Sequence, residues 1–343
     1  MTAPVSPVSI DRRTGSVLPA LASFLILTSL FLIKMRGESS SEALPPPSQG
    51  ETRLLERLKG HVSKLAGEIG ERNVWHPEAL DAAARYLDAR FRDAGYDAAS
   101  HSYRYGGHIL KNVVAELPGT TLADEIILLG AHYDSIIGSP GANDNATGVA
   151  AVLEIARLLA GQRLRRTVRF VGFVNEEPPF FQTEAMGSRV YARLARQRGE
   201  KIVAMLSLET IGCFSDVQGS QSYPFPFNLL SYPRTADFIG FVGNIASRDL
   251  VRRSVESFRR RAVFPAEAAA APGWLLGIGW SDHWSFWQEG YPAIMVTDTA
   301  LFRYKHYHSA TDTPDKIDYT RMARVVAGIA QVAADLAGSV SGR

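Results

Sequence analysis

Short apolar runs alternate with amphipathic stretches along the chain, and the two patterns predict different elements. Residues 126–129 form an apolar run typical of a strand that is buried on both faces, and residues 167–175 and 202–208 form two further runs of this kind. Between the first two runs, the apolar residues of 149–159 fall on one face of a helix. This alternation favours an α/β fold, which we expect to be a three-layer sandwich with a mixed, largely parallel central sheet.

Further elements are expected on both sides of this central region. Helices are expected over residues 52–64 and 77–93; in the second, Pro77 suits the first turn and Gly95 ends the helix. The remaining expected elements are strands at residues 103–105, 112–117, 237–243 and 293–297, and a C-terminal helix over residues 319–337.

Residues 17–33 form an uncharged, mostly apolar run with basic residues before and after it. As a helix this run would be roughly 25 Å long at 1.5 Å per residue, which spans a membrane core when the basic flanks reach the headgroups. No A-x-A cleavage site follows closely, so an uncleaved transmembrane signal anchor is favoured over a cleaved signal peptide. A soluble chain with a disordered apolar leader is the third interpretation.

The anchor divides the chain into a short N-terminal tail at residues 1–16, the transmembrane segment at 17–33, a Ser/Pro-rich linker at 34–50 and a folded domain at 51–343. Basic residues flank both ends of the anchor, so charge alone does not fix its orientation. We expect a single-pass membrane protein with a short cytoplasmic N-terminus and an exported domain, either periplasmic or extracellular.

Composition narrows the function classes. The chain has 343 residues, of which 46% are hydrophobic and 21% are charged, and this suits one large folded domain after the tail. The net charge is +2 and the basic residues are interspersed with acids, so a nucleic-acid partner is not expected and a small-molecule or peptide substrate is favoured. Cys213 is the only cysteine, which excludes an internal disulfide framework and a cysteine zinc site.

Histidine and acidic residues follow the apolar runs at their carboxyl ends. They are His132 and Asp134 after the first run, Glu176 and Glu177 after the second and Glu209 after the third, with His308 in a turn-rich loop near the C-terminus. Open α/β sheets place their ligands at this edge. A converging set of imidazole and carboxylate groups suits a hard or borderline divalent metal, with zinc favoured.

Taken singly, most of these residues also have a purely structural interpretation. His132 at a strand end is more often structural than a ligand, although Asp134 could accept its second ring N–H and orient the ring. Asp144 lies just before a helix N-terminus in an Asn, Gly and Asp cluster, which is also typical of a turn or a helix cap. Glu209 could simply form a salt bridge.

Two adjacent polar pairs are harder to explain in this way. Glu176 and Glu177 follow an apolar strand, and neighbouring carboxylates repel one another unless a cation or a proton separates their roles. One as a metal ligand and the other as a base removes the conflict. Asp282 and His283 lie among aromatic residues and are expected to support the site, with ligation the weaker alternative.

Several short motifs lie in the same order as in a known enzyme family, from about residue 75 to the end of the chain. They are His132-Tyr-Asp134-Ser, Asn143-Asp144-Asn-Ala-Thr-Gly, Asn175-Glu176-Glu177, Glu209, Ser281-Asp282-His283 and Tyr307-His308. The set resembles the co-catalytic di-zinc exopeptidase family, which includes secreted bacterial aminopeptidases, glutamate carboxypeptidase, the transferrin receptor ectodomain and glutaminyl cyclases.

The resemblance implies the zinc exopeptidase fold and a role for each candidate residue. By this resemblance, His132 and a further acid, expected to be Glu209, hold one zinc ion, Glu177 and His308 hold the other, Asp144 bridges both, Glu176 is the general base and Tyr307 helps to stabilise the tetrahedral intermediate. Residues 51–343 would then be the catalytic domain of a zinc-dependent aminopeptidase with two zinc ions per chain. It would release N-terminal residues from peptide substrates, with a metal-bridged water as the nucleophile.

The sequence departs from the family pattern in two places. The family usually has aspartate where this chain has Glu209, which makes this ligand the least secure of the set. If it fails, one zinc ion remains, as in glutaminyl cyclases. After Glu177, residues 178–181 and several more precede Gly187 and Ser188, whereas the family commonly reaches the corresponding Gly-Ser sooner. We expect these extra residues to reshape the substrate pocket.

Three functions therefore stay open: a zinc aminopeptidase, which is favoured, a single-zinc acyltransferase of the glutaminyl cyclase kind, and a metal-free binding ectodomain. Residues 213–238 are rich in aromatic residues and could line an apolar pocket at the metal site or cover a flank of the core. No arginine cluster marks recognition of an acidic side chain, so release of neutral N-terminal residues is the default expectation. The sequence does not indicate an oligomeric state.

Overall fold

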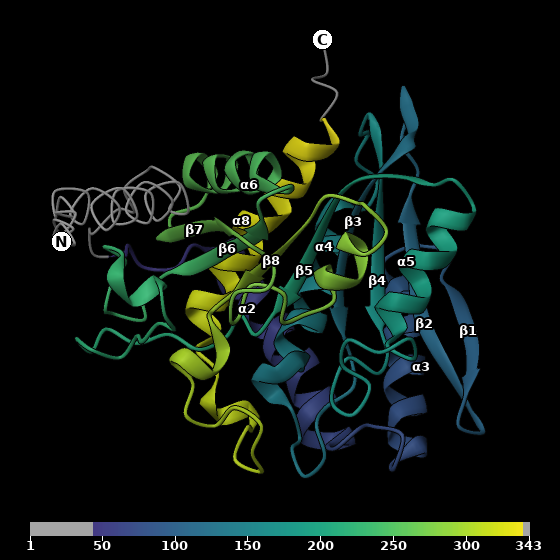
Figure 1. The fold of residues 1–343 in the computed structure, drawn as a ribbon, viewed down its shortest axis with the longest axis horizontal. Helices are drawn as coiled ribbons and strands as arrows, with labels where there is room; N and C mark the ends of the chain where they lie inside the picture. Colours follow the sequence, from purple (N-terminus) through teal and green to yellow (C-terminus); the bar gives the residue numbers. More distant parts are fainter. Residues whose placement is uncertain (1–43, 339–343) are drawn as a thin grey trace, which may run out of the picture.

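The apolar runs of the sequence become the inner strands of an eight-stranded sheet (Figure 1). The structure is a computed structural model and describes residues 44–338. Across the sheet the strands are β1 (Ala99–Tyr105), β2 (His108–Leu117), β4 (Arg166–Phe173), β3 (Leu122–His132), β5 (Lys201–Glu209), β8 (Ala293–Thr297), β6 (Ile239–Asn244) and β7 (Ala266–Ala271).

Strand direction decides where the polar residues at the strand ends meet. β3 pairs in parallel with β4 and β5, β5 pairs in parallel with β8, and β6 pairs in parallel with β7. The pairs β1 with β2, β2 with β4, and β6 with β8 are antiparallel. The expectation of a mixed, largely parallel sheet is confirmed, and the carboxyl ends of β3, β4, β5 and β8 lie along one edge.

Helices cover both faces of the sheet and complete a three-layer arrangement (Figure 1). One face packs against α2 (Gln49–Val62), α3 (Pro77–Asp93), α4 (Gly148–Leu159), α6 (Arg248–Arg261) and α8 (Tyr319–Ala337). The other face packs against α5 (Gly187–Gln197) and the short α7 (His283–Trp287).

Strand β3 shows why the central run is apolar throughout. Ile127 and Leu129 belong to the larger hydrophobic cluster, while Ile126 and Leu128 belong to the cluster on the opposite face. Successive side chains of a strand point to opposite faces, so a strand with helices on both faces needs apolar residues at every position. The expected burial of this strand on both faces is confirmed.

Most of the expected elements are present, with shifted ends. The helix over residues 77–93, the strand at 293–297 and the C-terminal helix at 319–337 have the expected bounds. The first helix begins at Gln49, three residues before the expected start at 52, and Ser48 caps it and forms a capping box with Glu51.

The sequence pattern did not predict α5, α6 or β7. The sequence of β7 is Ala-Glu-Ala-Ala-Ala-Ala, and alanine has a low strand propensity. The strand forms because its backbone pairs with β6 and its small side chains are buried on both faces. In α6, the apolar residues Leu250, Val251, Val255 and Phe258 lie on one buried face of an otherwise arginine-rich helix.

The expected membrane anchor at residues 17–33 lies outside the described residues. Within residues 44–338, no helix combines the length and apolar character needed to cross a membrane. At the start of this range, Leu44 packs against the larger hydrophobic cluster, and Arg324 of α8 donates a hydrogen bond to the backbone carbonyl of Pro45. The last residues of the expected linker therefore contact the folded domain.

Candidate metal centre

Two groups of possible metal ligands lie at the carboxyl edge of the sheet, and Asp144 belongs to both. One group contains His132, Asp144 and Glu209, and the other contains Asp144, Glu177 and His308. In each group, one ligand atom per residue lies within 4.8 Å of the others. These are the two groups that the family resemblance implies.

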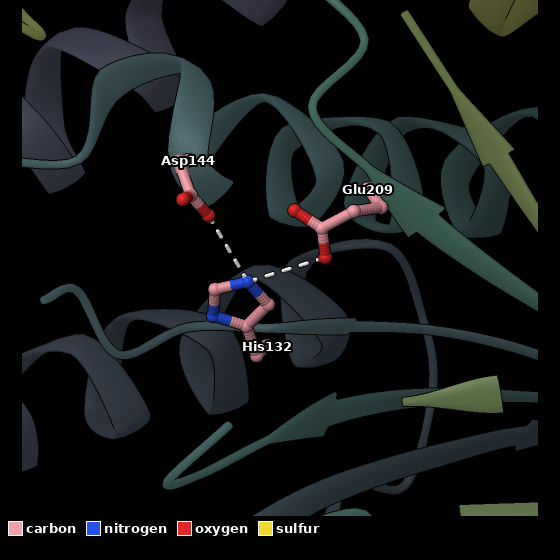
Figure 2. Close-up of side chains that lie close together, drawn as sticks. All are labelled: His132, Asp144 and Glu209. Atoms are coloured by element: carbon pink, nitrogen blue, oxygen red, sulfur yellow. Dashed lines mark ion pairs between the residues drawn. The ribbon is translucent and has the colours of Figure 1, made fainter. Parts of the chain in front are cut away.

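The first group is built from two adjacent strands and one loop. His132 ends β3 and Glu209 ends β5, so parallel pairing brings them together. The Nε2 atom of His132 lies 3.2 Å from Asp144 Oδ1 and 3.3 Å from Glu209 Oε2, and Figure 2 shows this nitrogen facing both carboxylates. The longer side chain of glutamate at position 209 therefore still reaches the histidine.

The second group joins the loop after β4 to the C-terminal loop. The Nε2 atom of His308 lies 3.0 Å from Asp144 Oδ2 and 3.3 Å from Glu177 Oε2. The backbone N–H of Ile136 donates to Glu177 Oε1 at 3.1 Å, which fixes the direction of this carboxylate. The ring of Tyr307 stacks on that of His308, with 3.8 Å between the centroids.

Glu176 is buried beside these groups but belongs to neither. Its Oε2 atom lies 3.9 Å from Nε2 of His132, which is too far for a hydrogen bond. The adjacent glutamates thus take different positions: Glu177 lies with the possible ligands and Glu176 lies next to them. Their different positions fit the expectation that one acts as a ligand and the other as a base.

Asp134 aligns both glutamates. Its Oδ1 and Oδ2 atoms accept the backbone N–H groups of Glu176 and Glu177, each at 3.1 Å. β3 ends at His132, so Asp134 lies in the loop that follows the strand. Its backbone carbonyl lies 3.2 Å and its carboxylate Oδ1 3.5 Å from Nδ1 of His132, so it does lie beside the second ring nitrogen.

Two residues that the sequence did not single out hold the loop that carries Asp144. Asp312 accepts the backbone N–H of Asn143 at 2.8 Å and that of Asp144 at 3.1 Å. The guanidinium of Arg72 is fully buried and donates to the backbone carbonyl of Tyr133 at 2.6 Å and to that of Gly141 at 2.8 Å. No local pattern indicates this role of Arg72, because Tyr133 and Gly141 lie 61 and 69 residues away along the chain.

Amide and hydroxyl side chains form further hydrogen bonds around the first group of possible ligands. Ser281 donates to Glu209 Oε2 at 2.7 Å, and Asn145 donates to the backbone carbonyl of Leu208 at 2.8 Å. Asp298 accepts the side-chain N–H of Asn143 at 3.0 Å. The Asn-Asp-Asn motif could have indicated these two asparagines, but Asp298 follows a strand that carried no other candidate.

Asp282 and His283 are adjacent but differ in their surroundings: Asp282 interacts with residues of the site, whereas His283 packs against an aromatic ring. Asp282 is fully buried and interacts electrostatically with His132 and Glu176, and burial raises its pKa to about 7. The ring of His283 packs edge-on against Trp287, and its Nε2 atom lies 2.8 Å from the backbone carbonyl of Ile278. His283 is in neither group of possible ligands.

The two histidines are surrounded by carboxylates, which favour their charged forms. Burial lowers the pKa of His308, but hydrogen bonds to Asp144 and Glu177 outweigh this effect and raise it to about 10. Burial also acts to lower the pKa of His132, and the surrounding carboxylates raise it well above its ordinary value. The site therefore stabilises positive charge at both nitrogen ligands.

The pKa values of three carboxyl groups of the site are raised, which shows that nearby positive charge would stabilise their ionised forms. Burial raises the pKa of Glu177 to about 7, and the nearby charge of Asp144 adds to the shift. Burial likewise raises the pKa of Glu209 and raises that of Glu176 well above its ordinary value. Buried carboxylates this close together need compensating cations, and imidazole with carboxylate is a donor set that zinc uses. The residues present fit zinc.

An apolar pocket opens beside the first group. Glu209 and Tyr307 line it next to the possible ligands, and Tyr223, Phe227 and Tyr232 line it from the 213–238 segment. The rings of Tyr223 and Tyr232 stack with their centroids 5.5 Å apart. Of the two roles that the sequence left open for this segment, lining a pocket at the site is the one observed.

Solved structures of similar fold include zinc aminopeptidases and glutaminyl cyclases. The zinc aminopeptidase BSAP of Bacillus subtilis superposes with a TM-score of 0.65 at 13% identity, over 88% of this chain and 98% of that chain. A glutaminyl cyclase of Bacteroides thetaiotaomicron superposes with a TM-score of 0.61 at 17% identity, over 84% of this chain and 98% of that one. At these identities the likeness concerns the fold.

Sequence similarity is more specific. The uncharacterised protein YfbL of Escherichia coli (strain K12) is 37% identical over 291 residues, which cover 82% of this chain and 88% of YfbL. Leucine aminopeptidase 1 of Arthroderma otae is 25% identical over 255 residues, or 67% of this chain and 62% of that protein. Residues 112–333 match peptidase family M28. The resemblance read from the motifs is confirmed: the chain belongs to peptidase family M28.

Proposed function

We propose that this protein is an aminopeptidase that uses two zinc ions to remove the first residue of a peptide. The observation that carries the proposal is the pair of ligand groups that share Asp144. A shared carboxylate between two sets of ligands suits a two-metal hydrolytic site. Membership of a peptidase family, with a leucine aminopeptidase among the relatives, supports the same conclusion.

His132, Asp144 and Glu209 would hold one ion, and Asp144, Glu177 and His308 the other. The chemistry supplied by zinc, when bound, is polarisation of the scissile carbonyl and a lowered pKa for water. Asp134, Asp312 and Ser281 hold the ligands in place through the hydrogen bonds described above, so binding requires little rearrangement of the chain.

Glu176 is placed to move the proton. It is buried next to the ligands, and its pKa lies well above the ordinary value because of burial, with the charges of Glu209 and Glu177 adding to the shift. A raised pKa suits a carboxylate that takes a proton from the attacking water and returns it to the leaving amine. The hydrogen bond from the backbone N–H of Glu176 to Asp134 fixes the backbone of Glu176 for this role.

Tyr307 is placed to assist at the developing oxyanion. Its ring lies against that of His308, and burial raises its pKa well above the ordinary value, with the carboxylates of the site adding to the shift. The phenol therefore keeps its proton and can donate a hydrogen bond. The apolar pocket beside Tyr307 and Glu209 is available for the side chain of the first residue of the substrate.

The single-zinc acyltransferase function is less well supported. It would follow if glutamate at position 209 could not act as a ligand. The 3.3 Å separation of Glu209 Oε2 from His132 Nε2 places this carboxylate within the first group. Ser281 also donates to it at 2.7 Å and holds it in this direction. Both features favour two metal ions.

We also propose that residues 17–33 anchor the protein in a membrane and that the folded domain is exported. The apolar run with basic residues on both sides supports this proposal. In bacterial cells making the full chain, the protein is expected in the membrane fraction after an alkaline carbonate wash, and protease added to spheroplasts is expected to degrade the domain. A chain that stays in the soluble fraction, or resists the protease, would contradict it.

Metal content and substrate type test the main proposal together. The full-length protein is expected to contain about two zinc ions per chain by elemental analysis and to hydrolyse aminoacyl anilides until a chelator is added. One zinc ion with cyclisation of an N-terminal glutaminyl peptide and no anilide hydrolysis would indicate the acyltransferase. No bound zinc at all would indicate a binding ectodomain.

Substitution separates the proposed base from the proposed bridging ligand. Glu176→Gln is expected to lower kcat at least about 100-fold while zinc content stays the same, because general base catalysis contributes on this scale. Asp144→Asn is expected to lose zinc as well as activity. Glu184→Gln, an exposed residue of the same loop, is the matched control and should behave as the native protein. Equal zinc loss in the Glu176 and Asp144 variants would refute the division of roles.

The pH dependence follows from competition between protons and zinc. In the metal-free site the pKa of His308 is raised to about 10 and that of Glu177 to about 7, so zinc must displace protons from ligands that are protonated at low pH. Apparent zinc affinity is therefore expected to fall as pH decreases below about 10, and more steeply below about 7, and activity at limiting zinc is expected to fall with it. Added zinc should shift the profile to lower pH. A profile that is flat down to about pH 5 would be inconsistent with histidine ligands.

A further inference from the structure

The apolar pocket extends from the metal centre across one face of the sheet. Register places four residues in one row: Glu209 of β5 pairs with Thr297 of β8, Thr297 pairs with Gly240 of β6, and Gly240 pairs with Glu267 of β7. All four line the pocket. Adjacent strands lie about 4.8 Å apart, so the two glutamates are separated by roughly 14 Å along the floor of the pocket.

The walls of this pocket are apolar and its acidic residues lie at the two ends of the row. Glu209 and Glu267 are the acids that line it, and among the described residues no lysine, arginine or histidine lines it. The other walls are formed by aromatic and aliphatic side chains, which include Tyr223, Phe227, Tyr232, Phe238, Ile278 and Met295.

Glu267 has a cationic neighbour that lies outside the pocket. It is 6% exposed and is surrounded along β7 by alanines. Arg259 of α6 interacts electrostatically with Glu267 and donates to the backbone carbonyl of Ala266 at 2.7 Å. Arg259 is absent from the residues that line the pocket. The carboxylate at the pocket wall therefore has a guanidinium nearby, although no described cation lines the pocket itself.

We propose that this pocket binds the side chain of the first residue of the substrate and that Glu267 makes lysine and arginine the preferred residues. The proposal rests on the aminopeptidase function proposed above. With the scissile carbonyl at the Glu209 end, Glu267 lies three strand spacings away, so only the longest side chains would approach its carboxylate. Their methylene groups would contact the apolar walls, and their cationic ends would meet a carboxylate.

Gly240 keeps the path to Glu267 open. It lies in the middle of the row, between Thr297 and Glu267, and has no side chain to fill the floor. A Cβ atom added there would contact the backbone oxygen of Thr297 at 3.3 Å and would have two methyl groups within 4 Å, so the position has room for a small side chain but a larger one would project into the pocket. The proposed preference for basic residues differs from the neutral preference expected from the sequence.

The first test compares lysyl and norleucyl anilides with the zinc-loaded full-length protein. Norleucine has the same four-carbon side chain without the ammonium group, so the ratio of the two kcat/KM values reports the charge alone. We expect lysyl anilide to be favoured at least about tenfold, because a buried hydrogen bond to a charged group contributes on this scale. In Glu267→Gln, this ratio is expected to fall by a similar factor.

Two further variants test whether the preference for lysyl over norleucyl anilide depends on the pocket. Glu256→Gln, an exposed residue of α6 that pairs with Arg252, is expected to keep the native ratio. Gly240→Leu is expected to lower kcat/KM for lysyl and norleucyl anilides relative to alanyl anilide, because it fills the middle of the pocket. Lysinamide should also bind more tightly than norleucinamide to the Glu176→Gln variant in calorimetry.

The possible failures are distinguishable. If the zinc-loaded protein hydrolyses none of the anilides, the aminopeptidase function is wrong, and the proposed preference falls with it. If it hydrolyses norleucyl anilide as well as lysyl anilide, or if Glu267→Gln leaves the ratio unchanged, the role of Glu267 is wrong while the aminopeptidase function stands.

Discussion

The carboxylate of Asp144, buried between two histidines, is the interaction on which the site depends. One oxygen lies 3.2 Å from His132 and the other 3.0 Å from His308. These contacts hold the pKa of Asp144 well below its ordinary range although burial opposes the shift. A charged group in this position is stable only if the surrounding chain keeps positive partners on both sides of it. The rest of the edge of the sheet is arranged to do so.

Two aspartates that belong to neither group of possible ligands hold the backbone of the site loops by hydrogen bonds. Asp134 accepts the backbone N–H groups of Glu176 and Glu177, and Asp312 accepts those of Asn143 and Asp144. Arg72 binds the carbonyl groups on the other side of the same loop. Loops usually leave such groups to solvent, and here buried side chains satisfy them. The positions of the ligands are therefore set before any metal binds.

Much of this could be predicted from the sequence because the information is local. An apolar run such as 126–129 predicts a buried strand, and parallel strands bring His132 and Glu209 to one edge. The loop groups that Arg72 and Asp312 hold, such as the carbonyl of Tyr133 and the N–H of Asn143, lie far from them in the sequence, so no local pattern indicates these roles. Strand β7 escaped prediction for another reason: its alanines favour a helix, and pairing with β6 overrides that preference.

In the proposed enzyme, one row of paired residues would connect the chemistry to the choice of substrate. Glu209 belongs to a group of possible metal ligands, and Glu267, three strands away on the same face, lines the pocket. The possible ligands come from the ends of β3 and β5, the loops after β3 and β4 and the C-terminal loop, whereas most of the pocket is formed by β8, β6, β7 and the 213–238 segment. Because Glu209 is the only possible ligand among the described residues that line the pocket, a substitution elsewhere in the pocket would change the preferred residue while the possible ligands stay in place. Position 267 is where such a change would act most directly, since a neutral residue there would remove the acid at the far end of the pocket.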